Sequence, residues 1–296
     1  REKVIVNQLL IIKIFVIVLV CSTFTYFLLN FKYGQEQLTL KAKLQTVVSG
    51  FVANFFDTFG IGSFSSYFAL RNLFGLLPDN KRYNGTLVVQ ATLPTMLQSV
   101  LFLQLVKIDS LTLIVSCVAI ALGGVVSGYF VKYVTKNAIY NVMLITFVIT
   151  AIILILSKMN MLNVGGELSQ VRGIELIVLA VVMFLAGCLP AFGVGYYSIV
   201  LVVIFLLGLS PAVAYPIMTT ASAVQMPMTA VPMIKNRQFY SLSAIIMAVT
   251  GCLAVLVAAP IISKIDATML KWILLVVLVY NIWMLIKAKL ELKASA

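Results

Sequence analysis

The stretch Thr58-Phe59-Gly60-Ile61-Gly62-Ser63 interrupts a long apolar segment, and Ala191-Phe192-Gly193-Val194-Gly195-Tyr196 interrupts another one 133 positions later. Shifting the chain by this offset aligns ten identical residues within 36 positions, without a gap. Self-similarity at a fixed offset is typical of a chain built from structural repeats. The matches are Phe59, Gly60, Gly62, Ser65, Leu73, Gly75, Leu76, Pro78, Thr86 and Pro94 with Phe192, Gly193, Gly195, Ser198, Leu206, Gly208, Leu209, Pro211, Thr219 and Pro227.

The chain around these stretches is too apolar for a water-soluble globule. Of its 296 residues, 62% are hydrophobic and 10% are charged, and the mean hydropathy is +1.11. Apolar runs close to the roughly 20 residues that cross a bilayer cover residues 111–131, 139–156, 241–262 and 269–286. The runs are continuously apolar, whereas membrane barrel strands alternate in polarity. The predicted fold class is therefore an all-α integral membrane protein.

The basic residues predict how the segments cross the membrane. The 21 Lys and Arg residues fall singly or in pairs between apolar runs, which does not fit a nucleic-acid-binding patch. If each interrupted segment enters and leaves at one face, almost every basic cluster lies in the cytoplasm, as topology rules require. If it crosses instead, Lys235 and Arg237 lie outside. We therefore predict two inverted repeats, each a re-entrant helical hairpin plus three transmembrane helices, preceded by one N-terminal transmembrane helix.

The domain boundaries follow from this topology. Residues 1–43 are predicted to form the N-terminal transmembrane helix and a cytoplasmic linker, and 44–157 the first repeat. Residues 158–175 are an extracytoplasmic linker, and 176–296 the second repeat. The first apolar segment is too long for a cleavable signal sequence, so we expect it to stay in the membrane.

The interrupted segments predict an anion site. Arms of about 14 to 16 residues reach roughly 20 Å, which brings each tip near the midplane of the bilayer. Paired broken elements there are typical of secondary transporters, and the start of the second arm points free N–H groups at the tip. The alternative is that the glycines only allow close helix packing. The predicted substrate-binding residues are Gly60, Ile61, Gly62, Ser63, Gly193, Val194, Gly195 and Tyr196.

Polar residues occur in the middle of the helix that follows each interruption. Neutral donors of this kind suit an anion that must be released again, although each hydroxyl alone can bond its own backbone. Pro94 and Pro227 lie at equivalent points of the two helices and are predicted hinges. From the mid-helix set of Thr86, Gln90, Thr92, Thr95, Gln98, Ser99, Thr219, Thr220, Ser222, Gln225 and Thr229, we assign Thr86, Gln90, Thr219, Thr220 and Gln225 to the site.

Asp57 is the one acid beside an interruption, three residues before Gly60. An acid at that depth is a candidate carrier of a coupling proton or cation. Its repeat counterpart is Pro190, so the feature is asymmetric, and the alternative is a cap on the local turn. The chain has no histidine, and its four cysteines lie in apolar segments without ligand spacing. We therefore expect neither a metal nor another cofactor.

The repeated pattern of Gly-x-Gly hairpin, apolar arm, Leu-x-Pro turn, threonine-bearing helix and two further spans resembles the sulfite exporter TauE/SafE family over residues 44–290. The residues that carry the resemblance are Gly60, Gly62, Gly193, Gly195, Pro78, Pro211, Thr86 and Thr219. The family typically has a longer glycine run at the hairpin, where this chain has Ser63 and Tyr196. The resemblance implies a multi-pass protein that exports sulfite or a small organosulfonate, such as sulfoacetate, across a bacterial cytoplasmic membrane.

Three other functions fit parts of the pattern. An anion channel can be built from the same hairpins, and an importer of another small anion would use the same site. An intramembrane enzyme would need a nucleophile with a base, or a metal cluster. The sequence has no HExxH motif and no histidine, and Asp57 is its one deeply placed acid. The residues by themselves therefore predict a carrier of a small anion and no enzyme.

Overall fold

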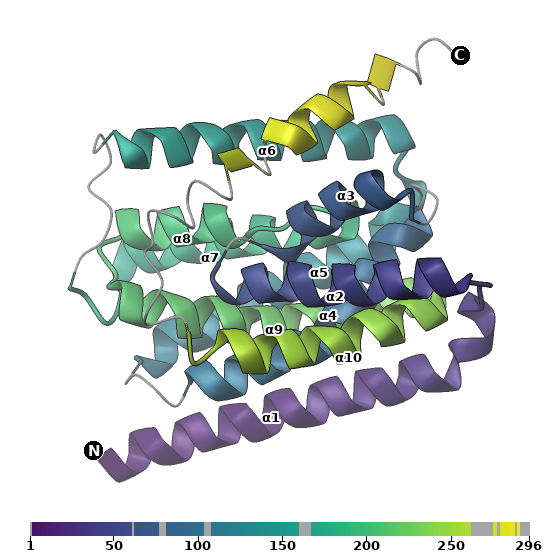
Figure 1. Ribbon diagram of the computed structural model, residues 1–296. Helices are drawn as coiled ribbons and strands as arrows, with labels where there is room; N and C mark the ends of the chain where they lie inside the picture. Colours follow the sequence, from purple (N-terminus) through teal and green to yellow (C-terminus); the bar gives the residue numbers. More distant parts are fainter. Residues whose placement is uncertain are drawn as a thin grey trace.

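The chain folds as an all-helical protein in the computed structural model, which describes residues 2–60, 62–76, 81–103, 108–159, 167–261, 275–276, 279–287 and 289–290. Over these ranges no β-strand occurs, and a single isolated bridge joins Leu168 to Leu209. The predicted all-α class is thus confirmed for the described part of the chain. Figure 1 shows the helices as a bundle in which most axes run in similar directions.

The helices alternate with short links and 3-10 turns. Several begin at a side-chain cap, as α2 does where the Thr39 hydroxyl accepts a hydrogen bond from the N–H of Ala42. The helices are α1 (Glu2–Leu29), η1 (Phe31–Gly34), α2 (Leu40–Thr58), α3 (Ser63–Phe74), α4 (Lys81–Phe102), α5 (Ser110–Phe130), η2 (Val131–Tyr133), α6 (Lys136–Lys158), α7 (Gly173–Cys188), η3 (Leu189–Phe192), α8 (Tyr197–Leu206), α9 (Pro211–Lys235) and α10 (Ser241–Ala258).

Five helical segments within the described residues are long and apolar enough to cross a membrane: 9–29, 81–102, 110–133, 173–192 and 241–258. Four of them coincide with predicted spans. The fifth, formed by α7 and η3, is the first arm of the second predicted hairpin, so its length and composition would also suit a crossing. Of the predicted last span, 269–286, residues 269–274 and 277–278 lie outside the described residues, and the others are helical. These segments fit an integral membrane protein.

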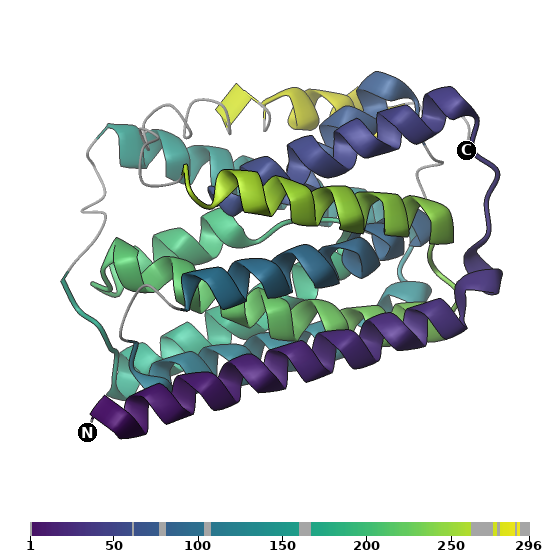
Figure 2. The ribbon, with the colours of Figure 1, turned by 60° about the horizontal axis from the view of Figure 1, so that its bottom comes forward.

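The bundle has a polar centre and an apolar periphery. In the most apolar stretch of α4, 72% of the residues are buried inside the protein, whereas in that of α1 only 17% are. α4 and α5 pack against α9, α2 packs against α10, and α7 packs against α5. Figures 1 and 2 show α1 along the outside of the bundle, where it contacts α9 and α4. A helix so exposed and so apolar (mean hydropathy 2.4 over 9–29) requires lipid around it.

Glycines allow the closest helix crossings. A Cβ atom placed on Gly123 would lie 2.0 Å from the carbonyl oxygen of Phe184, and one placed on Gly187 would lie 2.1 Å from that of Ile120. No side chain fits at such a distance from a backbone atom. The tight contact between α5 and α7 therefore depends on these two glycines, as small residues do at helix interfaces in membranes.

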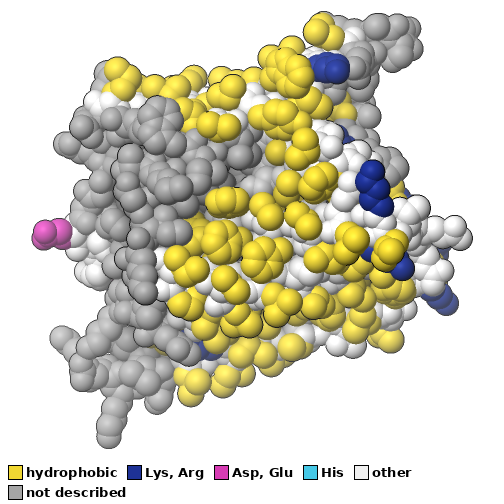
Figure 3. All heavy atoms as spheres, in the orientation of Figure 1, with side chains coloured by type: hydrophobic (Ala, Val, Ile, Leu, Met, Phe, Trp, Pro, Cys, Tyr) yellow, Lys and Arg dark blue, Asp and Glu magenta, His cyan; other side chains and the backbone are white. Residues whose placement is uncertain are grey.

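Basic side chains gather at one end of the bundle. Lys81, at the start of α4, donates a hydrogen bond to the carbonyl oxygen of Lys132 after α5, and Arg82 donates to the Phe239 carbonyl oxygen before α10 at 3.0 Å. In Figure 3 most of the visible Lys and Arg side chains lie toward the right-hand end, and hydrophobic side chains cover the middle. Segments predicted to be cytoplasmic thus meet at this end.

An ion pair marks the opposite end. Asp109, which caps α5, accepts a hydrogen bond from the Arg172 guanidinium at 2.7 Å, and Arg172 immediately precedes α7. The hydrogen bonds from Arg172 hold the pKa of the Asp109 carboxyl well below its usual range. The pair joins a loop between α4 and α5 to the start of the second interrupted segment.

The interrupted segments are two pairs of helices, and their arms are less equal than predicted. α2 has 19 residues and α3 has 12, while α7 has 16, followed by the four of η3, and α8 has 10. The first arm is longer because α2 already begins at Leu40, inside the predicted linker. The second arm is shorter because Gly75 ends α3 in the left-handed conformation, with φ of 65°. α3 contacts α2, and α8 contacts α7.

Candidate functional site

The two glycine interruptions, which are far apart in the sequence, touch each other inside the bundle. A Cβ atom placed on Gly195 would lie 3.8 Å from the Cα of Gly62 and 3.6 Å from the Cβ of Phe64. Gly62 immediately precedes α3, and Gly195 lies two residues before α8. The N-terminal ends of both second arms therefore converge on one point. Backbone N–H groups at such ends have no partner within their own helix.

A small cavity lies at this point. Its lining comes from both interruptions and from the helices that follow them, α4 and α9. The cavity measures about 10 Å³, which is room for about one water molecule. In this conformation it is therefore closed around its centre and too small for a sulfur oxyanion. It is lined by Asp57, Gly62, Ser63, Phe64, Thr95, Gly195, Tyr196, Tyr197, Ser222 and Met226.

The two glycines at the cavity differ from those that serve helix packing. A Cβ on Gly62 would meet nothing within 4 Å, and one on Gly195 would make only ordinary van der Waals contacts. Gly62 instead needs to be glycine because its φ is +84°, which side chains rarely adopt. The packing explanation holds for Gly187, which has a backbone oxygen 2.1 Å from its Cβ position, but the geometry gives it no support at Gly62.

Asp57 fills the N-terminal end of α3. One carboxylate oxygen accepts a hydrogen bond from the backbone N–H of Ser63 at 2.6 Å, and the other accepts from the Gln98 side-chain amide of α4 at 3.0 Å. The sequence alone leaves this N–H free for a substrate. In the structure, the protein's own carboxylate takes it. Asp57 is 5% exposed, and both of these donors are neutral groups.

A chain of hydrogen bonds links this carboxylate to the second interruption. Tyr197, the first residue of α8, donates from its hydroxyl to the side-chain amide oxygen of Gln98, Oε1, at 3.3 Å. The Gln98 amide in turn donates to Asp57 and, at 3.3 Å, to the Thr58 hydroxyl. Gln98 therefore connects the start of α8 to the start of α3 across the bundle. A shift of either second arm will strain this connection.

Two buried hydroxyls at the cavity make no hydrogen bond of normal geometry, although they lie close enough to interact with each other. They are Tyr196 Oη, which is contributed by the second interruption, and Ser222 Oγ, which is contributed by α9. Tyr196 is 1% exposed and Ser222 is fully buried. A buried hydroxyl without a partner costs free energy, roughly 1–3 kcal/mol. Such groups are expected where a ligand or a water completes the site.

Three of the predicted threonines lie away from the cavity and bond to other parts of the protein. Thr86 donates to the Arg82 carbonyl oxygen at 2.6 Å and accepts from the backbone N–H of Tyr240 at 2.9 Å, which ties α4 to the start of α10. Thr219 donates to its own helix at the Tyr215 carbonyl oxygen. Thr220 accepts from Ser99 at 3.1 Å, between α9 and α4. The contacts of Thr86 and Thr220 hold helices together, whereas that of Thr219 stays within α9.

The predicted glutamines also lie outside the cavity lining. Gln90 accepts from Asn54 at 3.3 Å, and Asn54 also donates to the Tyr67 hydroxyl at 2.9 Å. Gln225 donates to the Gly187 carbonyl oxygen at 3.1 Å and to Thr229 at 2.7 Å. The two residues join α4 to α2, and α9 to α7. They are therefore buried links between the helix pairs and the central helices.

The remaining predicted residues are placed as follows. Gly60 and Gly193 both have positive φ, of 84° and 79°, and the Cβ position of Gly193 lies 2.6 Å from Asn84 Oδ1. Val194 is fully buried. Ile61 lies outside the described residues. Pro94 and Pro227 lie within α4 and α9, which pack against each other.

Sequence reasoning selected four of the residues that line the cavity, together with Asp57, and passed over the others. Thr95 and Ser222 belong to the mid-helix polar set, as does Gln98, which bonds Asp57. Gln98 follows Gln90 by two helical turns, so both face the same side of α4. The shared helix face of Gln90 and Gln98, together with the depth of Asp57 in the membrane, could have indicated that Gln98 belongs to the site. Tyr197 carried no signal beyond its place after the interruption.

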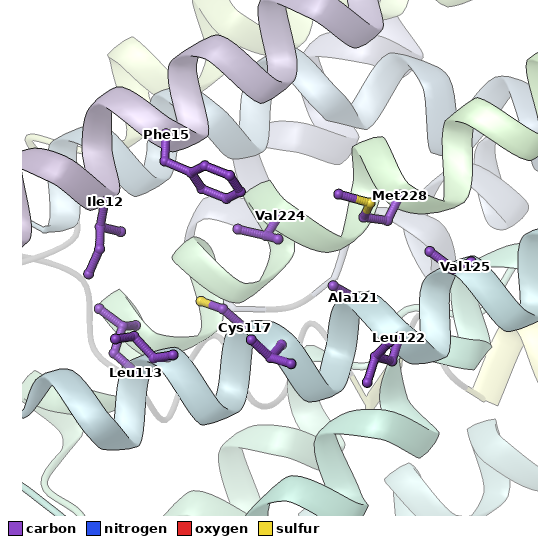
Figure 4. A pocket seen from close by; sticks show the side chains of 11 residues that line it. Ile12, Phe15, Leu113, Cys117, Ala121, Leu122, Val125, Val224 and Met228 are labelled. Atoms are coloured by element: carbon purple, nitrogen blue, oxygen red, sulfur yellow. The ribbon is translucent and has the colours of Figure 1, made fainter.

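A larger cavity, of about 350 Å³, lies between α1, α5 and α9 (Figure 4). Its walls are formed by apolar side chains such as Phe15, Leu113, Leu122, Val224 and Met228. It offers an anion no polar group, and burying a charge there without a partner is prohibitive. The small polar cavity therefore remains the candidate site.

The described residues contain no group of three or more His, Cys, Asp and Glu side chains close enough together to hold a metal ion. Comparison with family models, with curated proteins and with solved structures found no match to the chain. The geometry of the site is therefore the basis for assigning a function.

Proposed function

We propose that this protein is a secondary transporter that carries a small anion through the membrane by alternating access, with the anion bound where the two glycine interruptions meet. The observation that carries the proposal is the cavity between Gly62 and Gly195. It joins the N-terminal ends of α3 and α8 with two unpartnered buried hydroxyls, Tyr196 and Ser222. Helix N-termini and hydroxyls stabilise negative charge without a buried cation.

The proposal includes two inverted repeats, each with a re-entrant hairpin. Helix packing supports it: the first arm α2 packs on α10 of the other half, and the first arm α7 packs on α5 of the other half. In each contact a glycine faces a larger residue. Gly251 of α10 faces Asn54 of α2, and Gly187 of α7 faces Ile120 of α5. Asn54 and Gly187 are related by the repeat offset of 133. Ile120 and Gly251 are related by an offset of 131, because the alignment of the two repeats shifts by two residues after Pro94.

We further propose that the substrate is a small sulfur oxyanion or organosulfonate, such as sulfite or sulfoacetate, exported across the bacterial cytoplasmic membrane. The resemblance to the TauE/SafE family supports this choice of substrate, direction and membrane. The cavity chemistry agrees with it, since several acceptor oxygens on one small anion can bond to diverging N–H and O–H donors at once. The proposed site consists of the cavity residues given above.

The small size of the cavity fits a carrier between its two open states. Alternating access requires the site to close before it opens to the opposite side. The prolines within α4 and α9, Pro94 and Pro227, leave carbonyl oxygens without their helical partner and provide points at which these helices bend. Opening would separate the α3 end from the α8 end and break the Tyr197–Gln98 hydrogen bond.

Flux measurements in proteoliposomes test the proposal. Purified protein is reconstituted and radiolabelled sulfite, sulfate, methanesulfonate, sulfoacetate and taurine are offered separately, with and without a pH gradient. We expect saturable, protein-dependent movement of sulfite or a sulfonate. Absence of movement and of binding for every anion tested contradicts the proposal. Turnover far above about 10³ per second, beyond what conformational cycling typically allows, would identify an anion channel instead.

A further inference from the structure

Asp57 lies where a bound anion would lie. Its carboxylate accepts the Ser63 N–H at the start of α3 and lines the same cavity as Tyr196 and Ser222. Both carboxylate oxygens accept hydrogen bonds, as those of an ionised carboxylate do, and in this form the chain itself supplies the negative charge at the helix end. A substrate oxyanion that enters the cavity meets an ionised carboxylate within a few ångströms. Two like charges in a buried site cannot both remain ionised at low cost.

The second observation is the pair of unpartnered hydroxyls. Tyr196 Oη and Ser222 Oγ are at least nine-tenths buried, line the cavity, and make no hydrogen bond of normal geometry, either with each other or with another group. Asp57, by contrast, has donors on both oxygens. The site thus has two free hydroxyl donors, Tyr196 and Ser222, on the α8 side, and the Asp57 carboxylate as an acceptor on the α3 side. An anion fits the α8 side if the charge of Asp57 is removed.

A proton is the means of removing that charge. The titratable groups that face Asp57 are phenols: Tyr67 of α3, together with Tyr196 and Tyr197 at the start of α8. α9 contributes Tyr215, whose hydroxyl donates to the Phe59 carbonyl oxygen, and the one titratable side chain of α10 is Cys252. α4 contributes neutral Gln98. Phenols and thiols ordinarily stay protonated at neutral pH, so the carboxylate is the group here that can gain a proton.

We propose that Asp57 is a built-in stand-in for the substrate anion and takes up one proton each time an anion binds, so that anion and proton cross together. This inference rests on the proposed carrier function. The proton comes from water on the side where the anion enters and forms an O–H bond on the carboxylate. It returns to water on the other side when the anion leaves. No bond within the anion changes.

Coupling of this kind has a consequence for energetics. A monoanion that moves with one proton transfers no net charge, so the membrane potential neither drives nor opposes it. Export then follows the outward gradient of the anion itself and is opposed by an acidic exterior. The direction of transport in a cell would be set by these two concentration gradients.

The test uses methanesulfonate, whose negative charge is fixed over the usable pH range, so that any proton movement belongs to the protein. Proteoliposomes contain a pH-sensitive dye, and the membrane potential is clamped with a potassium ionophore. We expect wild-type protein to acidify the lumen by one proton for each methanesulfonate taken up, independently of the potential. Asp57→Asn is expected to move the anion without a proton and to respond to the potential. The control Asp109→Asn, outside the cavity, should couple as wild type does.

A second measurement tests the inference even if Asp57→Asn folds poorly, because it uses wild-type protein. It also applies if the protein carries sulfite but not methanesulfonate, because either anion can be added. Infrared difference spectra of wild-type protein are recorded on addition of sulfite or methanesulfonate. We expect the carbonyl band of a protonated carboxyl to appear with the anion. Anion movement or binding without proton uptake and without this band would overturn the inference and leave the carrier function standing. Absence of movement and binding for all anions would overturn both.

Discussion

The two glycine interruptions are equivalent in sequence but differ in how their helix ends are satisfied. At the first, Asp57 accepts the Ser63 N–H and leaves α3 with an internal anion. At the second, the residue equivalent to Asp57 is Pro190, and the start of α8 has Tyr196 with an unpartnered hydroxyl. The first end has a partner within the chain, and at the second we propose that the anion supplies one. The difference teaches that two copies of one motif can contribute different groups to a shared site: a carboxylate at the start of α3 and a hydroxyl donor at the start of α8.

The largest expected effect concerns the faces from which the two helix pairs enter. Leu73 at the end of α3 and Leu206 at the end of α8 are equivalent in the repeat, and both are exposed. With the natural cysteines replaced, we expect Leu73→Cys to react with an impermeant thiol reagent only from the cytoplasm and Leu206→Cys only from outside. Reaction of both from one face would mean that the two pairs are parallel.

The next effect separates the cavity glycine from another glycine with positive φ elsewhere. Gly62 and Gly75 both have positive φ, 84° and 65°, and neither has a neighbour within 4 Å of its Cβ position. Gly75 is left-handed, so leucine there should cost about 1–2 kcal/mol of stability. At Gly62, whose ψ of 118° lies outside the left-handed region, leucine should cost more. Because only Gly62 lines the cavity, we expect Gly62→Leu to abolish anion binding and Gly75→Leu to retain it. Thermal unfolding and binding, measured in the same detergent, check both expectations.

A smaller effect is expected when a tyrosine hydroxyl is removed, and its sign depends on whether that hydroxyl makes a hydrogen bond. The Tyr196 hydroxyl has no partner, whereas the Tyr67 hydroxyl accepts a hydrogen bond from Asn54 at 2.9 Å. We expect Tyr67→Phe to lower the free energy of unfolding by about 1 kcal/mol and Tyr196→Phe to leave it unchanged or slightly higher. Anion affinity should fall about tenfold only in Tyr196→Phe. Equal stability losses in the two variants would show that Tyr196 has a structural partner.

The smallest effect concerns how the first arms begin. α2 is capped by Thr39, and at the equivalent position before α7 stands Arg172, which pairs with Asp109. We expect Asp109→Asn to keep the cap on Thr112 and to lose less than about 1 kcal/mol, since Arg172 is half-exposed. The paired carboxyl has a lowered pKa. Its contribution is therefore complete above about pH 4 and disappears as the pH falls through the folded-state pKa.

Unfolding of wild type and Asp109→Asn, followed over a range of acidic pH, checks the sign of this effect. The stability difference should be constant near neutral pH and shrink on acidification. A difference that grows toward acid would assign the stabilisation to some group other than the ionised carboxylate.

The sequence by itself determined the class of protein and the positions of the interruptions. Apolar runs of membrane length are unfavourable in water, and a Gly-x-Gly sequence within such a run destabilises a continuous helix. Both features depend only on the local sequence. The position of Asp57, three residues before Gly60, also placed it beside the first interruption. These properties depend on neighbours within a few positions, which is why they can be read from the chain.

Only the tertiary structure decided which polar residues meet. Gly62 and Gly195 touch across 133 positions, and Gln98 reaches Asp57 from another helix. The polar residues of α4 and α9 differ little in type, yet Thr86 and Gln225 became links between helices while Ser222 faces the cavity. Which partner a buried polar group finds depends on helix rotation and crossing. Helix rotation and crossing angle are set by close contacts at residues such as Gly123 and Gly187, and they cannot be deduced from composition.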